Sequence, residues 1–144
     1  FTLQKTFRYR SWGSDHRVTR QEISKEDPVH LPAWLTFHTL WYEHDIRGDK
    51  LRFRAGIEAS FTDGFKGDRF MPATGLFYLQ DSVKTGNVWL IDAFVNLQIK
   101  TAVFYVKMDN MLDGLLTSNY YLTPDYPCPG RIFRFGIQWR FFDQ

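Results

Sequence analysis

The residue types that most often bind metals are few in this chain and widely spaced. The sequence has four histidines and one cysteine. His38 and His44 are the closest histidines along the chain, and on an extended strand their spacing corresponds to about 20 Å, which is too far for one metal ion. We place the other two, His16 and His30, in loops. A metal site is therefore not expected.

Catalytic patterns are also missing. The sequence contains no Gly-x-Ser-x-Gly, His-Glu-x-x-His, P-loop or Gly-x-Gly-x-x-Gly motif. Asp109 and Asp113 resemble part of a calcium loop, but the remaining ligands and the terminal glutamate are absent. Cys128 has no histidine or acidic partner at catalytic spacing, and we interpret it as a loop thiol. We expect no enzymatic activity, metal or cofactor.

Charged residues instead recur at alternate positions of strand-like segments, as expected for the wall of an aqueous pore. Five of them are basic and three are acidic, so a lumen lined by them would favour anions. The alternative is that these charges pair across neighbouring strands and fill the lumen. The candidate pore-lining residues are Arg52, Arg54, Glu58, Asp92, Lys107, Asp109, Arg134 and Arg140.

The elements that would position these residues are strands, because apolar and polar residues alternate with period two. The pattern is clearest over 131–143, where aromatic and aliphatic side chains face one way and Arg134, Gly136, Gln138 and Arg140 face the other. The facing of 33–45 is ambiguous, since aromatics occur at both parities. The predicted strands are 1–10, 33–45, 50–62, 88–99, 101–110 and 131–143.

Two charged residues disturb the pattern in the first two strands. Lys5 and Glu43 fall on the more apolar parity of their segments. An apolar face in contact with lipid should be free of charge, because a basic residue there costs about 2 to 4 kcal/mol at the bilayer midplane. The faces of these two strands are therefore the least certain from the sequence.

Short and long connections alternate between the predicted strands. The connections at 46–49 and around residue 100 are short, whereas 11–32, 63–87 and 112–130 are long. The long ones are rich in turn signals, and we expect a turn at Trp12-Gly-Ser-Asp15. Outer-membrane barrels have this asymmetry, with short turns on the periplasmic side, and it places the end of the last strand there. Within 63–87 we expect residues 76–79 to form a small hairpin.

Composition is compatible with such a barrel. No uninterrupted apolar run approaches the roughly 18 residues of a membrane-spanning helix. Aromatic residues make up 18% of the 144 residues, and the net charge of +2 gives no reason to expect a nucleic-acid partner. Alternation alone would also fit a soluble β-sandwich, but strand length, the connection asymmetry and the aromatic final strand favour a membrane barrel.

An ordered set of segments resembles a known family. It comprises Phe70-Met-Pro-Ala-Thr-Gly-Leu-Phe-Tyr-Leu-Gln80, Asp92-Ala-Phe-Val-Asn-Leu-Gln-Ile-Lys100, Asn119-Tyr-Tyr-Leu-Thr-Pro-Asp-Tyr-Pro127 and the final strand. Residues 33–143 resemble the C-terminal third of the putative porins of Bacteroidota. The resemblance implies an outer-membrane β-barrel with a signal peptide and further strands upstream, and no catalytic residues. The final strand, with Phe141 and Phe142, also resembles the signal read by the barrel-assembly machinery, apart from the Asp143-Gln144 extension.

Together these features predict an all-β fold: residues 1–144 as the C-terminal portion, about six strands, of one transmembrane antiparallel up-and-down β-barrel. Six strands cannot close a barrel, for which about eight are needed, so we expect upstream strands or, less simply, several chains that complete one wall.

The predicted function is passive diffusion of small solutes across the bacterial outer membrane. The alternatives are a structural or partner-binding barrel subunit and the C-terminal end of a TonB-dependent transporter. Expected partners are the outer-membrane bilayer, the barrel-assembly machinery, and further copies or other outer-membrane proteins.

Overall fold

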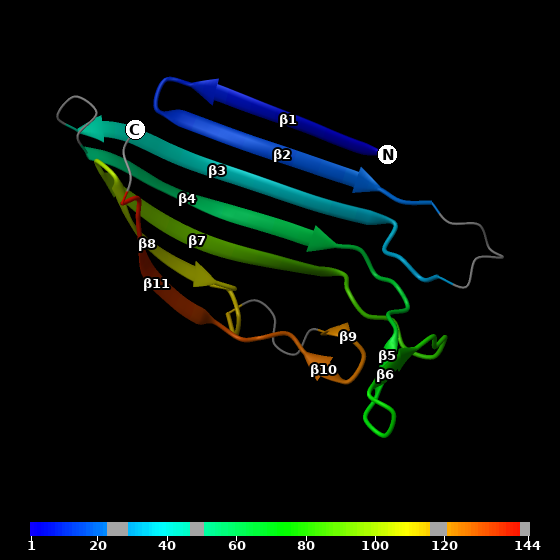
Figure 1. Cartoon of the computed structure of the whole chain (residues 1–144). Helices are drawn as coiled ribbons and strands as arrows, with labels where there is room; N and C mark the ends of the chain where they lie inside the picture. The colour runs from blue at the N-terminus through cyan, green and yellow to red at the C-terminus, as the bar shows by residue number, and fades with distance from the viewer. Residues whose placement is uncertain (23–28, 47–50, 116–120, 142–144) are drawn as a thin grey trace.

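The computed structural model describes residues 1–22, 29–46, 51–115 and 121–141. These residues form one antiparallel sheet of seven strands, in the order β1-β2-β3-β4-β7-β8-β11 (Figure 1). Each strand of this sheet pairs only with the sheet strands next to it along the chain. The strands are β1 (Thr2–Tyr9), β2 (Trp12–Arg20), β3 (Trp34–Ile46), β4 (Leu51–Thr62), β7 (Val88–Ile99), β8 (Ala102–Asp109) and β11 (Ile132–Trp139).

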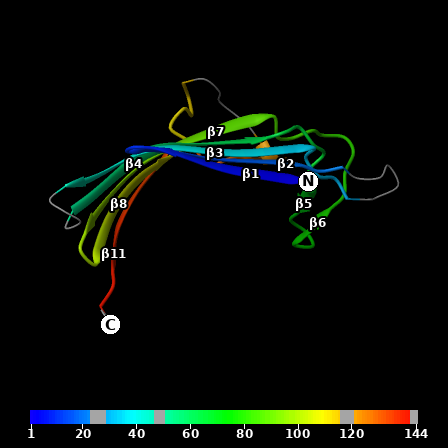
Figure 2. The ribbon, with the colours of Figure 1, turned by 90° about the horizontal axis from the view of Figure 1, so that it is seen from above.

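The predicted all-β, antiparallel architecture is thus confirmed, whereas closure into a barrel is not part of the described structure. The sheet is open, with β1 and β11 at its two edges. It curves along its strands, most strongly toward the end where the short connections lie (Figure 2). In the described part of the chain no helix is long and apolar enough to cross a membrane.

One strand was missed by the sequence prediction, which assigned 11–32 to a loop. Trp12–Arg20 form β2, paired with β1 from Tyr9 opposite Trp12 to Thr2 opposite Thr19. The turn between them lacks the Gly or Asn that usually marks a two-residue hairpin. Arg10 adopts the left-handed conformation there instead, with φ 54°. Gly13, which the sequence prediction took as a turn residue, lies within the strand. The corrected number of long strands is seven rather than six.

The alternation of short and long connections survives this correction. Residues 10–11 and 100–101 make two-residue connections, and 21–33, 63–87 and 110–131 make long ones. The connection between β3 and β4 falls on residues 47–50, outside the described residues. Figure 1 shows the short connections at one end of the sheet, where β11 also ends, and the long ones at the other.

The last strand is shorter than predicted. The segment 131–143 contains β11 (Ile132–Trp139), and pairing continues for one bond beyond it, since the Arg140 backbone N–H donates to the Thr101 carbonyl at 3.1 Å. Phe141 is exposed. Phe142, Asp143 and Gln144 lie outside the described residues.

Two small hairpins stand at the long-loop end. They are β5 (Arg69–Met71) with β6 (Leu76–Tyr78), and β9 (Tyr121–Thr123) with β10 (Tyr126–Pro127). The first confirms the hairpin expected around residues 76–79. An ion pair of 2.5 Å between Arg69 and Asp125 ties the two hairpins together, and Phe70 packs edge-on against Tyr126 with ring centroids 5.9 Å apart.

Buried polar groups hold the loop around the first hairpin. Gln80, 8% exposed, donates to the carbonyls of Gly67 and Val83 at 2.6 and 2.9 Å and accepts from the Ser82 and Val83 backbone N–H groups. The nearby Lys66 pairs with Asp81 at 2.8 Å. The described loop residues at this end of the sheet are therefore held together by hydrogen bonds and ion pairs, and we call them the loop layer.

Candidate functional site

Strand register places the predicted pore-lining residues on one face of the sheet. Residues directly opposite each other in an antiparallel pair project to the same side. Glu58 lies opposite Asp92, and Arg134 lies opposite Lys107. We call this side the charged face. It carries Arg52, Arg54, Glu58, Asp92, Lys107, Asp109 and Arg134, and the residue just beyond β11, Arg140, continues it.

The register also settles the ambiguous facing of β3. Glu43 lies opposite Arg54 and Trp41 lies opposite Gly56, so this parity of β3 belongs to the charged face. The sequence prediction put Glu43 on the more apolar side because Leu35, Phe37 and Trp41 share its parity. The register places these three side chains on the charged face. Lys5, by contrast, does project from the apolar face.

An ionic cluster joins four strands at the centre of the charged face. The Lys107 ammonium nitrogen on β8 lies 2.6 Å from Glu58 on β4, 3.0 Å from Asp92 on β7 and 3.6 Å from Asp109. Arg134 on β11 pairs with the other oxygen of Asp109. The side chains of Lys107 and the three acids are only 13–29% exposed, so these pairs are less screened than surface salt bridges.

The two arginines of β4 are also partnered. Arg52 pairs with Asp45 across the β3–β4 hairpin at 2.7 Å. The Arg54 guanidinium lies 4.4 Å from the centre of the Trp41 ring and 5.9 Å from that of Phe94, within the range of cation–π attraction. Both charges therefore have partners on the charged face.

Aromatic rings cover glycines on this face. Trp41 lies opposite Gly13, and a methyl group added to Gly13 would overlap the Trp41 ring. The same holds for Phe94 over Gly56 and for Tyr105 over Gly136, each again a directly opposed pair. Because glycine has no Cβ, a large ring on one strand can lie over the glycine of the neighbouring strand. The rings therefore cover the charged face without projecting far from it.

The charged face is electrically more balanced than the sequence prediction implied. The described strands contribute six basic and six acidic residues to it, and Arg140 follows β11. The prediction of a basic excess left out β1, the missed β2, and β3, whose facing was ambiguous from the sequence. The charged residues it missed are Arg8, Asp15, Arg17, Glu43 and Asp45. Alternation was the signal that could have found Asp15 and Arg17, but the apparent turn at residues 12–15 concealed it.

A loop segment lies against the charged face near the ionic cluster. Cys128, Pro129 and Gly130 line one side of an open pocket of about 230 Å³, and Asp92, Asp109 and Arg134 line the other. The side-chain amide of Asn110 donates to the Pro129 carbonyl at 3.1 Å and anchors the segment. Burial raises the pKa of the Cys128 thiol, which stays protonated at neutral pH, so its chemistry agrees with the interpretation as a loop thiol.

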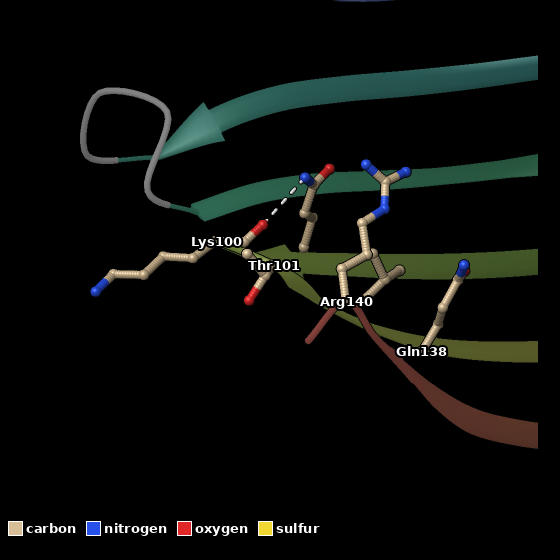
Figure 3. A pocket seen from close by; sticks show the side chains of 6 residues that line it. Lys100, Thr101, Gln138 and Arg140 are labelled. Carbon is tan, nitrogen blue, oxygen red and sulfur yellow. Dashed lines mark hydrogen bonds between the residues drawn. The ribbon is translucent and has the colours of Figure 1, made fainter. Parts of the chain in front are cut away.

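A second pocket, of about 200 Å³, lies at the short-turn end of the charged face. Gln98, Gln138 and Arg140 contribute polar side chains to it, together with Lys100, Thr101 and Val103. In Figure 3 the Gln138 and Arg140 side chains extend over the same face, whereas Lys100 points away. The side-chain amide of Gln98 donates to the Lys100 carbonyl at 3.3 Å. Amides and a guanidinium in this position suit contact with hydrated polar solutes.

The opposite side, which we call the apolar face, is of different chemistry. Over β4, β7, β8 and β11 every residue on it is aliphatic or aromatic. Aromatic pairs occupy both ends: Trp139 stacks on Phe141 with centroids 5.7 Å apart, and Phe61 contacts Trp89 at 5.0 Å. Aromatic residues at both ends of the strands are typical of the girdles of membrane barrels. Phe133 is also exposed on this face.

The histidines require one correction. His16 was predicted to lie in a loop, but it lies on β2 directly opposite His38, and their Nδ1 atoms are 2.9 Å apart. His30 does lie in a loop, 3.6 Å from Asp81. Among the described residues no group of three His, Cys, Asp or Glu side chains could hold a metal ion.

An antiparallel meander with one charged and one apolar face is typical of a β-barrel wall. The family described as Putative porin matches residues 1–143, and the chain belongs to this family. The match confirms the predicted porin resemblance and extends it to the first strands. It makes the chain a porin-like β-protein and points to the outer membrane. No curated protein and no solved structure matches the chain.

Proposed function

We propose that the chain is part of an outer-membrane β-barrel that forms a channel for passive diffusion of small hydrophilic solutes. The observation that carries the proposal is the separation of the two faces: paired charges and amides on one, and aliphatic and aromatic side chains on the other. In a barrel wall the charged face borders water and the apolar face borders lipid.

Closure of this barrel needs further strands. The outer edges of β1 and β11 are unpaired in the described sheet, and unpaired backbone groups are costly in hydrocarbon. We infer that upstream strands of the full-length protein pair with β1 and complete a ring back to β11. The segment Cys128–Gly130 would then lie inside the lumen, above the ionic cluster, and narrow the path on the long-loop side.

The balance of charge bears on selectivity. Because acids partner the bases on this part of the wall, we expect modest rather than strong discrimination between anions and cations. Arg52 and Arg54 nevertheless face the proposed lumen. Reversing both charges, Arg52→Glu with Arg54→Glu, should shift the reversal potential toward cation preference.

The test is conductance of the full-length protein in planar bilayers, combined with thiol modification. In a Cys128→Ser background, Gln98→Cys on the charged face should react with a water-soluble methanethiosulfonate and lower the conductance. Ala93→Cys on the apolar face of the same strand is the matched control and should not respond.

A folded protein that inserts into the bilayer without any conductance would contradict the channel and favour a structural or partner-binding barrel. The end of a TonB-dependent transporter would instead require a plug domain in the full-length sequence.

A further inference from the structure

One arginine in the interior of the charged face has no acidic partner. Arg54 is on β4, between β3 and β7, so the strands on both of its sides belong to the described sheet. Arg52, Lys107 and Arg134 each pair with a carboxylate. Arg54 forms no hydrogen bond or ion pair with a described residue, although Glu43 lies directly opposite it on β3. Its charge is therefore not neutralised within this part of the wall.

Two aromatic rings hold Arg54 in this position. Its guanidinium carbon lies 4.4 Å from the centre of the Trp41 ring and 5.9 Å from that of Phe94. Gly56 lies directly opposite both of these residues, and a methyl group added to it would overlap the Phe94 ring. Trp41 is only 6% exposed. The cation–π attraction to the rings thus competes with the ion pair that Arg54 could form with Glu43.

The edge of the Arg54 guanidinium is available to a ligand. Stacking on a ring occupies a flat face of the guanidinium and leaves the N–H groups along its edge. Among the described residues neither the buried Nε–H nor the terminal N–H groups of Arg54 have an acceptor. Parallel N–H groups of arginine match the two oxygens of a carboxylate or a phosphate. A neutral solute would not neutralise the charge, and a halide ion has no pair of oxygens to match the fork.

We propose that Arg54 is the residue at which the channel recognises oxyanions, which are solutes that carry a carboxylate or a phosphate. Its N–H groups donate to two oxygens of the passing solute. Trp41 is a positioning residue, because it holds the guanidinium away from Glu43. Contact with a single arginine still allows the solute to leave, as conduction requires. This inference rests on the proposed channel, in which the charged face borders the lumen.

The test measures the conductance of the full-length protein in planar bilayers at a constant KCl concentration while a second potassium salt is added. Potassium acetate and potassium phosphate should each lower the conductance in a saturable way, whereas potassium bromide should not. The salt with the lower half-blocking concentration identifies the preferred oxyanion. Arg54→Lys keeps the charge but not the fork, and should raise these concentrations about ten-fold, the size of one lost hydrogen bond to a charged group.

Arg17→Gln is the matched control for charge. Arg17 is exposed on the charged face of β2, another interior strand. It lies opposite Phe37, whereas Arg54 lies opposite Glu43, and these two β3 positions are about 20 Å apart on an extended strand. This separation exceeds the Debye length in physiological salt, so Arg17→Gln should change the half-blocking concentrations by less than about two-fold.

A second pair of variants tests the positioning role of Trp41. Trp41→Leu should let Arg54 turn toward Glu43, and the block by acetate and phosphate should weaken several-fold. Glu43→Gln in the same protein should restore part of the block, which it would not do if Trp41→Leu merely damaged the fold. Heat-modifiable gel mobility checks that each variant is folded.

A block of equal strength in Arg54→Lys and the unaltered protein, or an equal loss in Arg17→Gln, would overturn the assignment of Arg54. Failure of Glu43→Gln to restore the block would overturn the positioning role of Trp41. A protein that conducts chloride but is not blocked by acetate or phosphate would overturn this inference and leave the channel in place. A folded and inserted protein without conductance would overturn both.

Discussion

The two faces of the sheet are built from the same strands, yet they stabilise it in different ways. On the charged face, side chains bind one another across strands, as Lys107 does with Glu58 and Asp92. On the apolar face over β4 to β11, large side chains such as Phe135 and Ile137 are exposed and make no polar contact. The side chains of the charged face thus satisfy one another, whereas the side chains of the apolar face need an apolar environment to cover them. The comparison predicts that equal substitutions will have unequal costs on the two faces.

The largest effect is expected from a charge on the apolar face. Ile57→Lys, in the middle of β4, should destabilise the full-length protein in lipid vesicles by about 2 to 4 kcal/mol, because the ammonium would enter hydrocarbon. Gln98→Lys on the charged face is the matched control and should cost little. Urea unfolding followed by tryptophan fluorescence measures both. Equal costs would break the distinction between the faces.

The next effect concerns the ionic cluster. Lys107→Met removes the shared cation and leaves Glu58, Asp92 and Asp109 near one another, with Arg134 as the remaining base. We expect a loss of about 2 kcal/mol, below the cost for fully buried pairs because these groups are partly exposed. The reversal potential should also move toward cation preference. If neither stability nor selectivity changes, the cluster is neither structural nor part of the pore wall.

Glycine substitutions sharpen the view of the charged face. At Gly56 a new Cβ would lie 2.5 Å from the Leu40 carbonyl oxygen and 2.7 Å from Phe94, so backbone must move, and Gly56→Ala should cost about 1 to 2 kcal/mol. At Gly136 the near atoms belong to the side chain of Tyr105, which is exposed and can turn away. Gly136→Ala should therefore cost less. The reverse order in denaturant midpoints would contradict this account.

The smallest effect lies outside both faces, in the loop layer. The hydrogen bond and charge of Lys66 lower the pKa of the Asp81 carboxyl below its usual 3.8. The folded pKa is depressed, so the stabilisation is fully present above about pH 4 and is lost as the pH falls through the lowered value. Lys66→Gln should speed proteolysis of this loop at pH 7, and this effect should diminish as the pH is lowered below 4. An effect of the same size at every pH would argue against an ionic origin.

How much the sequence could predict depended on whether the signal was local. Alternation within β4, β7, β8 and β11 was enough to find these strands and to put Arg52, Asp92 and Lys107 on the polar side. It failed at β2, because Gly13 was interpreted as a turn residue when its absent side chain makes room for Trp41.

Relations between strands were beyond the reach of that signal. The facing of Glu43 depended on the β3–β4 register, and a shift of one residue exchanges the two faces. The contact from Lys107 to Glu58 crosses β7, and the long 63–87 connection leaves the β4–β7 register open from the sequence. The pairing of His16 with His38 was hidden for the same reason as β2.

The meander has a consequence for how the sheet can form. Each long strand pairs with its neighbours in the chain, and two of the hairpins need only two connecting residues, so little chain entropy is lost in bringing their strands together. Folding rates rise when contacts are close in sequence. Assembly can therefore advance by one hairpin at a time, each new strand using the previous one as its template, and the order of synthesis along the chain is also the order of neighbours in the finished wall.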